Sequence, residues 1–172
     1  MKASRVDPGA ARPKGYTAGR RLQLMTGTRH DPYQARRKPR SPSVCPACGL
    51  VFAAGRWQRG AAPAGAHDEL CPACHRIRDD YPAGYLTIDG PWAREYREQV
   101  LRTARNFAER MEAEHPLQRI MGIDDSDDRL VIRTTDIHLV QGMGRALYHA
   151  FQGRLEFSFV ESDYLLRVHW SC

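Results

Sequence analysis

Two short cysteine motifs, Cys45-Pro46-Ala47-Cys48 and Cys71-Pro72-Ala73-Cys74, decide how the middle of this chain folds, and 22 residues separate them. A spacing of two residues lets both thiolates of one tight turn point at a common ion, and Gly49 suits the left-handed turn that follows the first pair. Two such turns supply four soft ligands in tetrahedral geometry, which favours zinc. The spacing therefore predicts a zinc ribbon with one structural Zn²⁺ bound by Cys45, Cys48, Cys71 and Cys74.

Three other chemistries fit parts of these motifs. A rubredoxin-like iron site also uses four thiolates, but its second turn has a glycine where this chain has His75. Cys71 to His75 matches the attachment motif of haem c, which requires export, and we see no signal segment in the sequence. A redox dithiol or a pair of disulfides fits a reducing cytosol poorly. Four bound thiolates leave no open coordination position, so we expect a structural metal, with Cys172 outside the site.

The charge of the chain is distributed unevenly. The 172 residues carry a net charge of +6, and arginine supplies 23 of the 26 basic residues. Residues 1–43 carry a net charge of +9, whereas residues 44–172 carry −3. The first segment is rich in Gly, Pro and Ser and shows no apolar periodicity. We therefore expect residues 1–43 to form a basic, intrinsically disordered tail.

The remainder predicts an α+β fold in two parts. Residues 44–90 are expected to form the four-cysteine zinc ribbon, with short strands at residues 51–52 and 85–88. Residues 91–172 predict a small α+β domain of the order α-β-β-α-β-β, with helices on a mainly antiparallel sheet. Its expected helices begin near residues 91 and 135, and its expected strands cover residues 120–123, 130–133, 155–159 and 164–170. The apolar stripe of the first helix is Tyr96, Val100, Ala104, Phe107 and Met111.

The arginine-rich segments indicate an anionic partner. A guanidinium group matches phosphate geometry and stacks on bases, so arginines among aromatic residues are typical of RNA-binding segments. Such residues occur in the tail, around Trp57, after the second cysteine motif and along one polar face of the second helix. The candidate RNA-binding residues are Arg20, Arg21, Arg29, His30, Tyr33, Arg36, Arg37, Lys38, Arg40, Arg56, Trp57, Arg59, Arg76, Arg78, His138 and Arg145.

Each of these groups also has an interpretation without RNA. The ribbon arginines can neutralise the doubly negative tetrathiolate centre while Trp57 packs against the body. The tail can serve solubility alone, and the helix stripe that includes His138 and Arg145 can be a solvated face. The acidic run at residues 124–128 lacks the ligand spacing of an EF-hand and predicts a hairpin loop.

Further motifs carry a family resemblance from Asp31-Pro32-Tyr33 to Trp170, among them Gly55-Arg56-Trp57, Asp80-Tyr81-Pro82-Ala83-Gly84 and Glu114-His115-Pro116-Leu117-Gln118-Arg119. Together with the cysteine motifs they resemble an uncharacterised bacterial zinc-ribbon family that is sometimes labelled ATPase. The stretch from Thr134 to Leu147 is similar to the archaeal and eukaryotic large-ribosomal-subunit export adaptor named for nonsense-mediated decay. That adaptor has N-terminal zinc ribbons and binds the large ribosomal subunit, so the resemblance implies association with the ribosome or rRNA. The sequence contains no G-x-x-x-x-G-K-[ST] motif, so no phosphate-binding loop supports the ATPase label.

We therefore expect a cytoplasmic protein, not an enzyme, that binds the ribosome through large-subunit rRNA and ribosomal proteins. Its tail would enter a ribosomal channel, in the manner of a factor for ribosome hibernation or inhibition of translation. No apolar stretch approaches the roughly 18 residues of a membrane span, and no motif indicates a small-molecule substrate. The alternatives are a DNA-binding zinc-ribbon regulator, whose basic arm tracks a duplex, and an enzyme with a pocket in the α+β domain.

Overall fold

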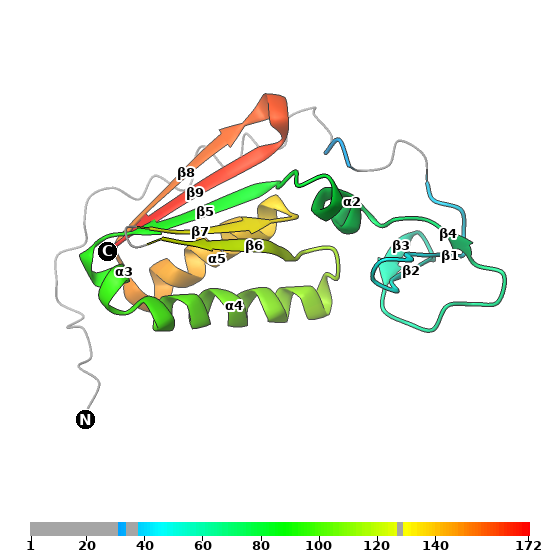
Figure 1. Cartoon of the computed structure of the whole chain (residues 1–172), viewed down its shortest axis with the longest axis horizontal. Helices are drawn as coiled ribbons and strands as arrows, with labels where there is room; N and C mark the ends of the chain where they lie inside the picture. Colours follow the sequence, from blue (N-terminus) through cyan, green and yellow to red (C-terminus); the bar gives the residue numbers. More distant parts are fainter. Residues whose placement is uncertain (1–30, 34–37, 127–128) are drawn as a thin grey trace.

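The first cysteine motif connects two strands of a small four-stranded sheet. The computed structural model describes residues 31–33, 38–126 and 129–172 (Figure 1). In this sheet β1 (Ser43–Val44) lies between β2 (Val51–Ala53) and β4 (His67–Asp68), and β3 (Arg56–Gln58) pairs with β2. The turn between β2 and β3 has positive φ at two residues, 51° at Ala54 and 78° at Gly55, as a tight two-residue hairpin requires. The short helix α2 (Pro72–Arg78) follows and carries the second cysteine motif.

A five-stranded sheet forms the second unit, in the order β6-β7-β5-β9-β8. Its strands are β5 (Gly84–Asp89), β6 (Ile120–Asp125), β7 (Leu130–Thr134), β8 (Arg154–Val160) and β9 (Leu165–Ser171), with the 3-10 turn η2 (Glu161–Asp163) between the last two. The central strand β5 pairs in parallel with β9 and antiparallel with β7, and the two edge strands pair antiparallel with their neighbours.

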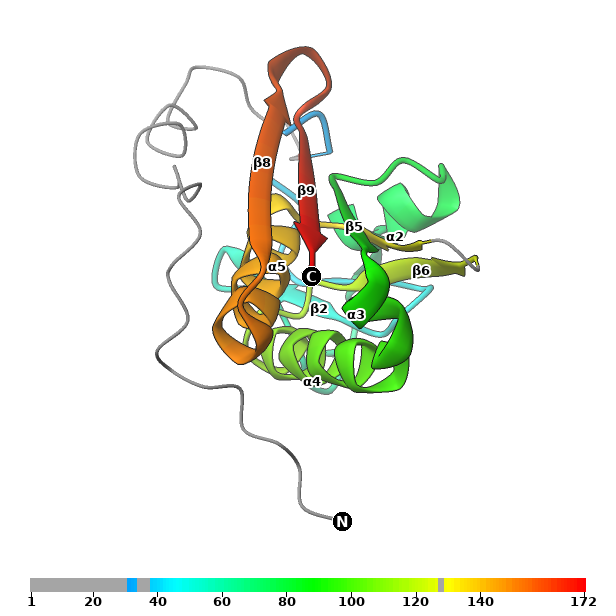
Figure 2. The ribbon, with the colours of Figure 1, turned by 90° about the vertical axis from the view of Figure 1, so that its left-hand side faces the viewer.

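The long helices α4 (Arg97–Glu114) and α5 (Ile137–Phe151) lie on one side of this sheet (Figure 1 and Figure 2). The N-terminus of α5 is capped by Asp136, whose Oδ1 accepts hydrogen bonds from the backbone N–H groups of His138 and Leu139 at 2.7 and 3.0 Å. Between helices and sheet lies a core of fully buried apolar side chains, which includes Leu86, Ile132, Val140, Leu147 and Trp170.

The helix predicted from residue 91 is two helices in the structure, α3 (Pro91–Glu95) and α4, because the chain bends at Tyr96 (φ −105°, ψ 29°). The prediction that Tyr96 lies on the buried stripe is wrong: this side chain is 41% exposed and stacks on Trp92, with ring centroids 4.6 Å apart. Val100 and Ala104 are buried as predicted, and Phe107 and Met111 are partly buried against the core.

The strand predicted at residues 85–88 exists but lies in the second unit rather than in the ribbon. Leu86 and Ile88 are buried and face the helices, and every residue of β5 is matched to a partner on a neighbouring strand of the second sheet. The ribbon elements therefore end with α2, and the order of the second unit is β-α-α-β-β-α-β-β. The mixed α+β class is confirmed by the four helices and two sheets of the described residues. Most of the predicted disordered tail, residues 1–30 and 34–37, lies outside them.

Candidate metal centre and nucleic-acid surface

The fold brings the four cysteines of the two motifs together. Their Sγ atoms all lie within 4.8 Å of one another, although 22 residues separate the motifs in the sequence. Cys45 and Cys71 are buried, whereas Cys48 lies at the surface of the cluster. This predicted grouping is confirmed, and its four sulfur atoms can hold a metal ion.

The first cysteine motif is a tight turn closed by backbone hydrogen bonds. The N–H of Gly49 donates to the carbonyl of Cys45 at 2.8 Å, and the N–H of Cys45 donates to the carbonyl of Leu50 at 2.8 Å. Gly49 has φ of +75°, a conformation that costs little for a residue without Cβ. The turn thereby places Cys45 and Cys48 on the same side of the loop.

The second cysteine motif begins a helix. Cys71 is the N-cap of α2, its Sγ accepts from the N–H of Cys74 at 3.4 Å, and Pro72 occupies the first turn, where no N–H is needed. The N–H of Cys71 in turn donates to Sγ of Cys45 at 3.4 Å, which ties the two motifs to each other. Backbone N–H groups thus point at sulfur atoms, an arrangement that favours thiolates.

The distances in the cluster fit a single tetrahedral ion. A Zn–S bond of about 2.3 Å at tetrahedral angles separates neighbouring sulfur atoms by about 3.8 Å. The Sγ atoms of Cys48 and Cys71 lie 3.7 Å apart. Four sulfur ligands would complete such a coordination shell, so a tetrahedral ion held here would have no position left for a substrate.

Arg119, which precedes β6, reaches the cysteine cluster from the second unit. Its guanidinium donates to Sγ of Cys48 at 3.4 Å and of Cys74 at 3.6 Å. Its backbone is fixed by Thr135, because the Arg119 N–H donates to Oγ1 of Thr135 at 2.8 Å and the Thr135 N–H donates to the Arg119 carbonyl at 3.0 Å. The nearby Leu117 packs against the buried cysteines. The cysteine cluster therefore contacts both units of the fold.

The protein environment gives the cysteine thiols different pKa values. Burial raises the pKa of Cys48, but hydrogen bonds from the Arg119 guanidinium and from the Leu50 backbone outweigh it and lower that pKa to about 6. Burial raises the pKa of Cys74 to about 11 and raises the pKa of Cys71 as well. Cys48 is thus deprotonated more easily than Cys71 and Cys74, and it presents a thiolate to an incoming cation before they do.

Replacement of Arg119 by leucine is expected to weaken metal binding about tenfold, in the range seen when groups that hydrogen-bond metal ligands are removed. Arg119 favours the thiolate of Cys48, so without it protons compete with the metal at higher pH. The pH of half-maximal metal release should therefore rise in Arg119→Leu. Competition with a chromophoric chelator, measured as a function of pH, checks both effects. Arg59→Leu is the matched control, because Arg59 bonds Glu112 and not the cysteines; equal affinities for the two variants would contradict the assignment.

The ribbon places part of its predicted RNA-binding residues on the surface. Arg56 and Arg59 are exposed in and after β3, and Arg78 is exposed at the end of α2. Trp57 is half-buried, and its ring packs against Phe52 with centroids 5.4 Å apart. Trp57 thus packs within the ribbon, whereas within the described part of the chain Arg119, and not the ribbon arginines, donates to the cysteine sulfur atoms.

Arg76 and Tyr33 serve the fold instead of the surface. The Arg76 side chain is 1% exposed, forms an ion pair with Asp31 and donates to the carbonyl of Tyr81 at 3.0 Å. Its guanidinium lies over the Tyr33 ring, 4.5 Å from the centroid, and the Tyr33 hydroxyl donates to Asp79 at 3.1 Å. Residues 31–33 are therefore fastened to α2, and we leave Arg76 and Tyr33 out of the RNA-binding surface proposed below.

The remaining predicted contacts fall on α5 and on the tail. His138 is exposed near the start of α5, and Arg145 is half-buried, its Nε having no hydrogen-bond partner within the described residues. Lys38 and Arg40 are exposed just before β1. The other predicted tail residues lie outside the described part of the chain; they are Arg20, Arg21, Arg29, His30, Arg36 and Arg37.

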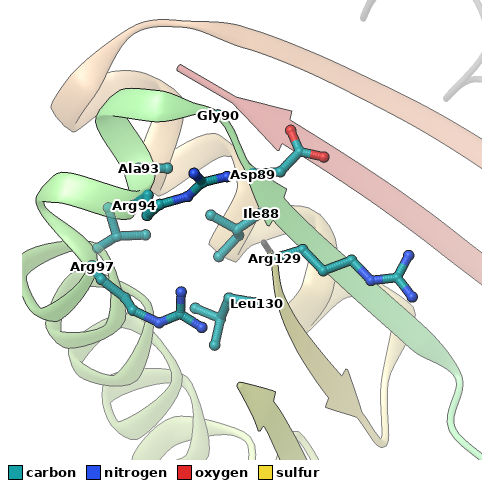
Figure 3. A pocket seen from close by; sticks show the side chains of 9 residues that line it. Ile88, Asp89, Gly90, Ala93, Arg94, Arg97, Arg129 and Leu130 are labelled. Atoms are coloured by element: carbon teal, nitrogen blue, oxygen red, sulfur yellow. The ribbon is translucent and has the colours of Figure 1, made fainter. Parts of the chain in front are cut away.

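Three arginines line a small cavity at the far end of β5 from the metal centre. Arg94, Arg97 and Arg129 surround it together with Ile88 and Leu130 (Figure 3). Arg97 forms an ion pair with Asp125. The cavity volume is about 10 Å³, room for about one water molecule, so it does not receive an organic substrate.

Comparison of the chain with family models, with curated proteins and with solved structures returns no match. Within the described residues, no helix is long and apolar enough to cross a lipid bilayer. We therefore infer a function from the cysteine cluster and from the distribution of charge along the chain.

Proposed function

We propose that the cysteine cluster binds one Zn²⁺ and that this ion has a structural role. Four thiolates are one of the usual ligand sets of structural zinc sites, and they leave no position for a substrate or an attacking water. The ribbon around them has only a small buried cluster, formed chiefly by Leu50 and the cysteines. Metal binding would thus supply folding free energy that this small core does not.

We further propose that the protein binds RNA and associates with the ribosome. The observation that carries this proposal is the junction of a strongly basic segment with the metal centre. Residues 1–43 carry a net charge of +9, and they lead directly into β1 and Cys45. Exposed Lys38, Arg40 and Arg56 continue the positive charge onto the ribbon.

The second unit would dock by specific contacts, because residues 44–172 carry a net charge of −3 and gain nothing from bulk attraction to phosphate. The basic segment would fold on RNA inside a channel, the zinc ribbon would hold the base of this segment, and the compact second unit would stay outside. This arrangement suits a factor that occupies a channel of the ribosome. Occupation of such a channel would block translation, so we propose a role on idle, hibernating ribosomes. The family resemblance favours the large subunit as the docking surface.

Deletion of residues 2–30 is expected to weaken binding to rRNA fragments at least tenfold at low salt. The deletion removes seven basic residues and one acidic residue but keeps Asp31 and Tyr33, which pack on α2. The plot of log affinity against log salt concentration should flatten by several units, since each phosphate contact contributes about 0.7 to 0.9 to the slope. Filter binding over a salt series measures both quantities.

A double variant, Arg102→Ala with Arg105→Ala, controls for a general loss of charge, because both residues are exposed on α4 of the second unit. Unchanged affinity and slope after the deletion would exclude residues 2–30 from RNA binding. Tighter binding of the full chain to duplex DNA than to rRNA would favour the DNA-binding alternative instead.

A further inference from the structure

The face of the five-stranded sheet opposite α4 and α5 carries polar, aromatic and charged side chains. The residues of β5, β7 and β9 alternate between buried and more exposed positions, with the buried ones facing the helices. The strand register aligns the outward residues in rows across the sheet. One row reads Arg133, Tyr85, Arg167 and Ser158, and the next reads Val131, Thr87, His169 and Glu156. An aromatic ring on the central strand thus lies between two arginines.

A groove opens over these rows between β5 and β8. Its volume is about 420 Å³, within the range of pockets that bind small organic molecules. Its outward side chains are those of Thr87, Glu156, Ser158, Arg167 and His169. Two hydroxyl groups, a carboxylate, an imidazole and a guanidinium therefore meet in one groove on an otherwise regular strand surface.

Arg167 differs from the other arginines of this face. Arg133 is paired with Asp80 and with Asp124, and Arg154 is paired with Glu156 at 2.6 Å. Arg167 is exposed and has no carboxylate partner among the residues that the structure describes. Its guanidinium lies over the Tyr85 ring, 5.1 Å from the centroid. It is a cation with a flat face, supported by an aromatic ring and open to a ligand.

His169 is fixed beside it by two carboxylates. Its Nε2 lies 2.8 Å from Oδ2 of Asp89, and its Nδ1 lies 3.5 Å from Oε2 of Glu156. The ring is held against the strand, and the carboxylates bring negative charge to one end of the groove. A fully anionic ligand, such as an acidic peptide, is repelled at that end. A ligand with one anionic group and a flat part that donates hydrogen bonds fits both ends.

We propose that this groove binds one nucleotide of single-stranded RNA, which deepens the proposed RNA-binding function and rests on it. The base stacks on the guanidinium plane of Arg167, whose N–H edge faces the phosphate. Thr87 and Ser158 offer hydrogen bonds to the base and to the 2′-hydroxyl group. Glu156, which lines the groove, accepts a hydrogen bond from an exocyclic amino group, which cytosine has and uracil lacks. Paired bases of a duplex are not available for this contact.

Fluorescence anisotropy with oligocytidine and oligouridine ten-mers tests the proposal on the full, metal-loaded chain. We expect oligocytidine to bind more tightly than oligouridine, and Arg167→Ala and Tyr85→Ala to weaken it about tenfold each. Arg167→Lys should not restore binding, because lysine keeps the charge but loses the plane. Arg105→Ala, an equal change of charge on the helical side, should leave the affinity unchanged. Circular dichroism verifies that each variant is folded.

A second readout identifies the surface directly. Photocrosslinking of an oligocytidine that carries one 4-thiouridine should label the peptides of β5 or β9. Tight RNA binding by the wild-type chain with no effect of Arg167→Ala and no crosslink to these strands would overturn the groove while leaving the proposed function intact. Absence of RNA binding by the wild-type chain would overturn both. Binding of an acidic peptide that depends on Arg167, without binding of oligocytidine, would assign the groove to a protein partner and overturn the proposal.

Discussion

Replacement of Cys71 by serine is expected to reduce bound metal from one ion per chain to none and to unfold the ribbon. Cys71 is fully buried and is a member of the sulfur cluster. It also caps α2 and donates its backbone N–H to Cys45. A serine hydroxyl is a poor substitute for a soft thiolate, and the small core of the ribbon does not compensate for the metal.

The measurement is elemental analysis of the purified variant together with amide NMR spectra. Signals from residues 38–78 should collapse toward unfolded positions, whereas those of the second unit persist, because its core is a separate cluster. Cys172→Ser is the control, since Cys172 lies outside the sulfur cluster and packs beside the second core. Full metal content in Cys71→Ser, or equal metal loss in Cys172→Ser, would contradict the assignment of the site.

Replacement of Trp170 by alanine is expected to destabilise the second unit by about 3 to 5 kcal/mol, the range for large-to-small changes at buried aromatic positions. Trp170 is fully buried on β9 and packs near Trp92 and Phe151. Its indole N–H donates to the carbonyl of Gln152 at 2.7 Å, just after the end of α5. The change leaves a cavity and an unpaired carbonyl at the junction of strand and helix. Since total stabilities are about 5 to 15 kcal/mol, such a loss brings the unit close to unfolding.

Urea denaturation followed by far-ultraviolet circular dichroism measures this loss as a lower midpoint. Trp170→Phe should lower the free energy of unfolding by less than Trp170→Ala does. The phenylalanine ring still fills most of the site, although the N–H donor is gone. Metal content should stay near one ion per chain in both variants under native conditions, since the cysteine cluster has its own core. A loss below about 1 kcal/mol in Trp170→Ala would show that this residue does not anchor the core as described.

The features that the sequence predicted well are those set by local spacing. Two residues between cysteines define each metal-binding turn, so the pairs could be recognised without knowledge of the fold. The polar run Thr134-Thr135-Asp136 ahead of an apolar helical stripe predicted the start of α5, without deciding which of the three residues is the cap. The alternation of Leu155, Phe157 and Phe159 predicted β8. These patterns depend only on neighbours along the chain, and the structure contains the elements that they predict.

Features that depend on distant pairing were less accessible. The strand at residues 84–89 was placed with the ribbon because it follows the cysteines, but its hydrogen-bond partners are β7 and β9, far along the sequence. Arg119 was missed as a contact of the metal centre because one arginine between a helix and a strand has no distinguishing local pattern. Arg76 looked like a surface cation until its pairing with Asp31, 45 residues earlier, was known. The run from Glu114 to Arg119 within the family resemblance was the available signal for Arg119.

Sucrose-gradient sedimentation of the tagged full-length protein in native lysates, from growing and from stationary cells, tests the central claim most directly. We expect the protein to migrate with the large subunit or the whole ribosome, more so in stationary cells. Ribonuclease or high salt should return the protein to the top of the gradient, and the ribosome-bound fraction should contain zinc. Protein that stays at the top of the gradient in every growth state would contradict a ribosome-bound function.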